Sequence, residues 1–159
     1  MKNNRGFTLI EFAVSFCLVA AISILLFQII ANMKQLYIAG DIKTSLLNRQ
    51  AIMTRKIYGE LNNKTVTSVN KCGDTCLRFT YSDNTSSDFV VDNTEKTITF
   101  HGYTLSYGTG STLGTFSVDN VTIGTNSLLE FQIPVKNKLA DGDYGIHIIW
   151  QYNGTIVTL

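Results

Sequence analysis

The sequence has only one proline, two histidines and three cysteines among its 159 residues. Charged side chains make up 16% of it, and Lys+Arg 13 against Asp+Glu 12 gives a formal net charge of +1. This balance excludes the strongly basic composition that is typical of nucleic-acid-binding domains. The shortage of histidine and cysteine, and the lack of paired acids on one helix face, leaves no recognisable catalytic constellation. We therefore expect a protein that is not an enzyme and that has no cofactor.

Charge is almost missing from the N-terminal part of the chain. Between residues 7 and 31 the only charged side chain is that of Glu11. About 20 apolar residues, at a rise of about 1.5 Å per residue, cross the ~30 Å hydrocarbon core of a bilayer. This run is therefore long enough for a transmembrane helix, and it lacks the short core and small-residue cleavage site of an ordinary signal peptide. Lys2 and Arg5 favour an N-terminus on the cytoplasmic side, with the rest of the chain outside.

Glu11 is the exception within this apolar run. A carboxylate in the hydrocarbon costs roughly 2.5 to 3.5 kcal/mol on insertion scales, so such a group needs a partner or a route to water. One interpretation is that Glu11 lies in the first helical turn, where the helix dipole favours an anion and the headgroups are within reach. The other is that it neutralises a positive charge from another copy of the chain.

The residues Gly6-Phe7-Thr8-Leu9-Ile10-Glu11, between a short basic leader and an apolar helix, resemble the processing signal of type IV pilins and type II secretion pseudopilins. The resemblance implies that a membrane prepilin peptidase cuts between Gly6 and Phe7 and that the new amino group of Phe7 is methylated. It implies that Glu11 pairs with the N-terminal amine of a neighbouring subunit during assembly. The implied partners are this peptidase, other pilin subunits, membrane lipid before assembly, and a membrane assembly platform.

Many members of that superfamily carry a helix-bending Pro or Gly in this helix, whereas residues 7–31 contain neither. This difference, together with an apolar run whose sequence diverges from that of the superfamily, favours a minor pilin or pseudopilin. The signal does not distinguish a type IV pilus from a competence or secretion filament. The implied location is the cytoplasmic membrane for the single-pass precursor and an extracellular filament after assembly.

Two of the cysteines, Cys72 and Cys76, lie in a short loop that is expected to be outside the cell. An oxidising compartment predicts a disulfide between them, and so short a loop predicts modest stabilisation. Cys17, in the apolar run, is expected to be a small buried hydrophobic residue. No second Cys or His pair lies near the two loop cysteines, and His101 and His147 are isolated, so no metal site is expected.

Beyond the apolar run, residues 32–63 continue the helix with one apolar face. The apolar positions at helical spacing are Ile38, Ile42, Leu46, Met53, Ile57 and Leu61. Such a face is buried either in a coiled coil or against a sheet. A sheet is the better expectation because the rest of the chain reads as strands, and Asn62-Asn63 predicts the end of the helix.

From residue 64 the pattern changes from a helical to an alternating period. The expected strands are 65–69, 77–81, 88–92, 97–101, 103–107, 115–123, 128–135, 144–152 and 155–159. Asn153-Gly154 is the strongest hairpin signal and predicts that the last two strands pair with each other. We predict an α+β fold, pilin-like, in which one long N-terminal helix packs on an antiparallel β-sheet.

These patterns predict four segments: a leader (1–6), a transmembrane and assembly helix (7–31), its amphipathic continuation (32–63) and an extracellular β-rich domain (64–159). The predicted function is that of a filament subunit assembled through its N-terminal helix. Two alternatives remain open. The chain is a single-pass protein that anchors an extracellular binding domain, or a filament-tip subunit that binds DNA or a surface.

Overall fold

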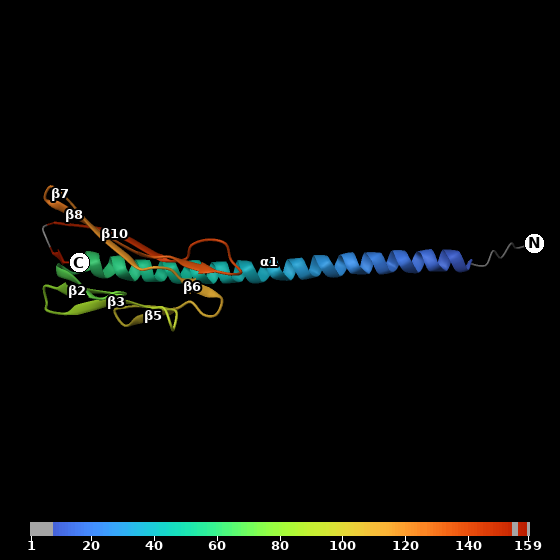
Figure 1. The fold of residues 1–159 in the computed structure, drawn as a ribbon, viewed down its shortest axis with the longest axis horizontal. Coiled ribbons are helices and arrows are strands. Elements are labelled where there is room, and N and C mark those ends of the chain that lie inside the picture. The colour runs from blue at the N-terminus through green and yellow to red at the C-terminus, as the bar shows by residue number, and fades with distance from the viewer. Residues whose placement is uncertain (1–7, 154–155, 159) are drawn as a thin grey trace, which may run out of the picture. The chain divides into compact units, whose positions relative to one another are not determined.

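The computed structural model describes residues 8–153 and 156–158. A long helix, α1, spans Leu9–Asn63 (Figure 1), so the predicted end of the helix at Asn63 is confirmed. The chain forms two compact units, which meet in the sequence between Gly40 and Asp41. This boundary falls inside the predicted segment 32–63, so the second half of α1 belongs with the strands. Gly6 and Phe7, the predicted processing residues, lie outside the described residues.

Most strands pair with their neighbours in the sequence. They begin with β1 (Val66–Gly73), β2 (Cys76–Tyr81), β3 (Ser86–Asp92), β4 (Thr97–Phe100) and β5 (Tyr103–Ser106). These five are antiparallel and lie in sequence order within one sheet. His101 and Gly102, with φ of 47° and 74°, form the two-residue turn from β4 to β5. Positive φ at both positions is what a type I′ hairpin turn requires.

The next five strands form two smaller sheets. They are β6 (Ser111–Leu113), β7 (Ser117–Ile123), β8 (Asn126–Ile133), β9 (Val135–Asn137) and β10 (Ile146–Asn153). One sheet has the order β10-β8-β7, and β6 pairs with β9 in the other. The prediction of one strand over 128–135 is wrong, because the chain changes sheet at Pro134. Proline has no N–H to donate to a ladder, which suits it to such a break.

The predicted final hairpin is also wrong. The last strand, β11 (Val157–Thr158), pairs with β1 in parallel and becomes the edge of the six-stranded sheet. β10 pairs instead with β8, from Ile146 opposite Ile133 to Asn153 opposite Asn126. The local turn signal at Asn153 is therefore overridden by long-range pairing, in which β11 pairs with the edge of β1 that β2 leaves free.

The second half of α1 is buried against these sheets. Its buried residues are Leu46, Met53, Ile57 and Leu61, and they share one core with the strands. The two larger sheets meet within this core, where the rings of Phe89 and Phe131 lie 5.1 Å apart between centroids. The predicted α+β fold and the packing of the helix on strands are confirmed.

Polar contacts also attach this part of α1 to the strands. Arg49 donates to the carbonyl of Ser106, and Gln50 Nε2 donates to the carbonyl of Gly145 at 2.5 Å. Tyr58 Oη donates to the carbonyl of Ile149 at 3.1 Å and accepts from its N–H at 3.3 Å. These three side chains thus bind backbone groups of the strand region.

Candidate functional site

Most of the exposed large hydrophobic residues in the described part of the chain lie on α1 in the first unit. Residues 8–38 are all exposed, including Leu9 at 87% and Phe27 at 78%. By length and composition this helix is able to cross a membrane, with a mean hydropathy of 2.6 over 18 residues. Apolar area left in water costs about 25 cal/mol per Å², so this surface requires lipid or protein around it.

Glu11, which lies in the first turn of α1, is held by its own chain. The carboxylate Oε2 of Glu11 accepts from the N–H of Thr8 at 2.9 Å and from its hydroxyl at 3.0 Å. In return, the N–H of Glu11 donates to Thr8 Oγ1 at 3.3 Å. This reciprocal pattern is a capping box, which satisfies backbone donors that a helix start otherwise leaves unpaired. Glu11 therefore occupies the first helical turn, as one of its two interpretations requires.

Other polar groups of this apolar segment are satisfied locally. The hydroxyls of Ser15 and Ser23 donate to the carbonyls of Glu11 and Val19, each at 2.8 Å. Such bonds remove the need for water at these positions, which suits an apolar surrounding. Cys17 is exposed, so the burial expected for it is not provided by its own chain.

The predicted disulfide between Cys72 and Cys76 is confirmed, with a Cα–Cα distance of 5.1 Å across the β1–β2 turn. Both sulfurs lie close to the carboxylate of Asp88, within 4.8 Å. Thiolates and carboxylates are zinc ligands, but here each sulfur is bonded to the other. Asp88 binds Arg78 through two contacts of 2.7 Å, and this guanidinium lowers the pKa of the carboxyl. The disulfide therefore fixes the turn between β1 and β2.

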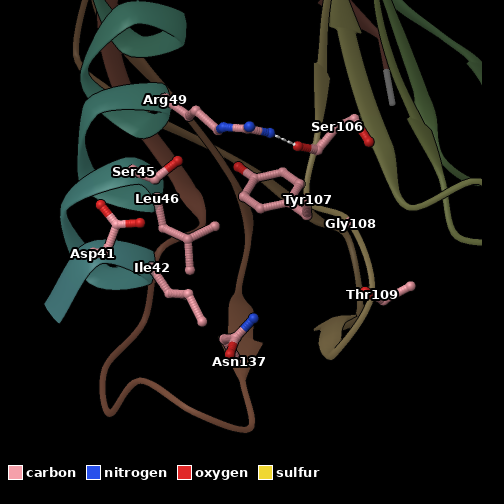
Figure 2. A pocket seen from close by; sticks show the side chains of 10 residues that line it. All are labelled: Asp41, Ile42, Ser45, Leu46, Arg49, Ser106, Tyr107, Gly108, Thr109 and Asn137. Atoms are coloured by element: carbon pink, nitrogen blue, oxygen red, sulfur yellow. Dashed lines mark hydrogen bonds between the residues drawn. The ribbon is translucent and has the colours of Figure 1, made fainter. Parts of the chain in front are cut away.

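A cavity of about 400 Å³ lies between the second half of α1 and the loop after β5 (Figure 2). Asp41, Ile42, Ser45, Leu46, Arg49, Ser106, Tyr107, Gly108, Thr109 and Asn137 line it. Arg49 extends across its upper part to the carbonyl of Ser106. Tyr107 is buried, and burial together with the charge of Asp143 raises the pKa of its hydroxyl. The cavity thus offers hydroxyls between one carboxylate and one guanidinium.

Both histidines have partners that sequence spacing did not reveal. His101 Nδ1 lies 2.7 Å from Ser87 Oγ, and its Nε2 lies 3.6 Å from Glu60 Oε1. Ser87 is only 2% exposed, which favours a structural role for its hydroxyl over that of a nucleophile. His147 Nε2 lies 2.7 Å from Glu130 Oε1 on the neighbouring strand. The contacts with Ser87 and Glu130 depend on the pairing of strands, and the contact with Glu60 depends on the packing of α1, so none of them is visible in the sequence.

Comparisons of the chain with protein-family models, with curated proteins and with solved structures gave no match. The observed architecture, a long apolar N-terminal helix and an α+β unit, is compatible with a pilin-like fold. The features that bear on function are thus the exposed helix with its capped carboxylate, the disulfide turn and the cavity.

Proposed function

We propose that this chain is a structural subunit of a type IV pilus, a competence filament or a type II secretion-like filament, and that it is a minor pilin or pseudopilin. The observation that carries the proposal is the helical surface over residues 8–38, exposed all round and bearing Glu11 at its start. The residues that precede and form this start also match the prepilin processing signal. A surface of this kind needs lipid before assembly and protein after it.

In the proposed mechanism, assembly replaces lipid by the helices of neighbouring subunits. Packing and electrostatics then supply the driving force, because lipid tails are as apolar as the helix surface itself. The Glu11 carboxylate, costly in hydrocarbon, gains the N-terminal ammonium of a neighbour. Thr8 holds the carboxylate in place before that exchange. The unit formed by residues 41–159 coats the filament.

The proposal requires processing of the precursor. Prepilin peptidase cuts between Gly6 and Phe7 on the cytoplasmic side and the new amine is methylated, so that residues 1–6 are absent from the filament. Intact mass and N-terminal fragmentation of the protein from sheared filaments or membranes test this step. A mature chain that begins at methylated Phe7 supports the proposal. A chain that still begins at Met1, in cells that contain the peptidase, contradicts it.

A second candidate is a single-pass membrane protein that anchors a binding domain outside the cell. The cavity lined by Asp41, Arg49 and Tyr107 favours it, because a recess with mixed polar groups suits a small polar ligand. An anchor has no need for a charge in its membrane span, so it tolerates Glu11→Ala, whereas a filament subunit with that change is processed normally and incorporates poorly.

A further inference from the structure

We propose that the exposed face of α1 in residues 41–63 binds the outer face of the β10-β8-β7 sheet of a second copy of this chain. The inference rests on the proposed function and adds to it a contact between the units outside the membrane. Both faces belong to the same compact unit, and each carries apolar side chains beside charges of one prevailing sign.

The helix contributes a mixed apolar and basic face. Ile52 is 43% exposed, although the opposite side of the same helix enters the core. Arg55 and Lys56, also exposed, follow three and four residues later and therefore lie on the same side of the helix as Ile52. An apolar side chain beside two cations suits a partner that is apolar and acidic.

The outer face of the three-stranded sheet has that character. Strand register places Asp119 opposite Glu130 and Val121 opposite Leu128, with Ile149 on the other side of Glu130. Val121 is 52% exposed and Ile149 45%. A cavity of about 280 Å³ lies at the distal part of these strands, where Val121 and Leu128 line it. This face therefore offers apolar area next to two carboxylates.

Among the residues that the structure describes, no lysine or arginine forms an ion pair with either carboxylate on this face. Like charges directly opposite each other on neighbouring strands destabilise a sheet. Glu130 contacts His147, which carries a charge only when it is protonated. A guanidinium from another copy, which is always charged, would offset Asp119 and Glu130 together. Arg55 on the helix face supplies such a group.

The distribution of charge along the chain agrees with this arrangement, because basic residues prevail in the helix and acidic residues in the strand region. Residues 32–63 carry five basic and two acidic side chains, and residues 64–159 carry six basic and nine acidic ones. The helix is therefore net positive and the strand region net negative, which favours contact between the helix of one copy and the strands of another. Because the contact joins two different surfaces, it is heterologous, and heterologous contacts that do not close produce open filaments.

Charge reversal in full-length copies tests the contact. Two differently tagged copies are produced together, and the fraction of one that co-purifies with the other from solubilised membranes is measured. We expect Arg55→Glu in both copies, or Glu130→Arg in both, to lower this fraction about tenfold, as expected for a desolvated charge pair. Lys138→Glu and Glu95→Arg make the same changes at exposed positions elsewhere and should have no effect.

Mixing the variants gives the sharpest outcome. When one copy carries Arg55→Glu and the other Glu130→Arg, one unaltered Arg55–Glu130 contact remains, so association should recover. If both variants behave like their controls while Glu11→Gln still abolishes incorporation into filaments, the inference is wrong and the proposed function stands. If Arg55→Glu lowers the co-purifying fraction but Glu130→Arg does not, and Arg55→Glu also releases the chain from phosphatidylglycerol-containing vesicles, the helix face binds lipid. The inference is then overturned.

Discussion

The two compact units of this chain differ in where their apolar side chains find cover. In the first unit Met33 is 65% exposed, and residues 8–38 are exposed throughout. In the second unit Met53 is 0% exposed and lies in a core shared with the strands. One continuous helix thus serves two purposes. Its second half stabilises a fold, while its first half presents an exposed apolar surface.

The two methionines allow a direct test of this contrast. Met53→Ala leaves a cavity in a packed core and should lower the free energy of unfolding by about 2–5 kcal/mol. Met33→Ala, the matched change in the exposed segment, should leave unfolding nearly unchanged. Thermal unfolding of the detergent-solubilised full chain measures both. Equal losses from the two variants would show that the first unit is packed within its own chain.

A change at Gly145 should rank next in effect. A Cβ built at this residue meets the backbone of Ile133 and Pro134, so Gly145→Ala forces strand β8 and the loop before β10 apart. It should also displace the carbonyl that accepts from Gln50. We expect a loss of about 1–3 kcal/mol, typical of overpacking. Gly59→Ala, where a Cβ meets nothing within 4 Å, is the control, and it should be neutral or stabilising.

The disulfide should contribute less, because it closes a short loop. Replacing both cysteines, Cys72→Ser and Cys76→Ser, should cost at most about 2 kcal/mol on the loop-entropy model. Chemical denaturation with and without reductant measures the effect in the unaltered chain. The unfolding curve of the double variant should not change with reductant. If it does change, the effect of reductant on the unaltered chain does not come from this disulfide alone.

The smallest expected effect concerns acid stability. Arg78 lowers the pKa of Asp88 in the folded chain below its ordinary value of 3.8. The ion pair therefore adds stability above that value, and the contribution disappears as the pH falls through the lowered pKa. Since the pair is partly exposed, we expect less than about 1 kcal/mol. Stability curves from pH 7 to pH 2 should be flatter for Asp88→Asn, and curves identical to those of the unaltered chain would refute this assignment.

Local patterns in the sequence were sufficient for much of the fold. Of the six apolar positions predicted at helical spacing, the four from Leu46 to Leu61 are buried, whereas Ile38 is 40% exposed. Hydrogen bonding within a helix, and side-chain alternation along a strand, depend on neighbours in the sequence, so they leave a readable period. The disulfide was predictable for the same reason, because its two cysteines are close in the chain.

Pairing between distant segments leaves no periodic pattern in the sequence. The parallel contact of β11 with β1, and the change of sheet at Pro134, depend on which edges the whole fold leaves open. The capping box of Thr8 and Glu11 is by contrast local, since it follows from the Thr-x-x-Glu spacing. The contacts of Arg49, Gln50 and both histidines arise only after the sheets have formed.

The most direct test of the central claim is incorporation of a Glu11→Gln chain into filaments. Glutamine keeps the acceptor of the capping box but removes the charge, so it separates the role of Glu11 within its own helix from pairing with a neighbour. The account predicts that this chain is processed normally, remains in the membrane and is largely absent from sheared filaments. Incorporation equal to that of the unaltered chain would contradict it.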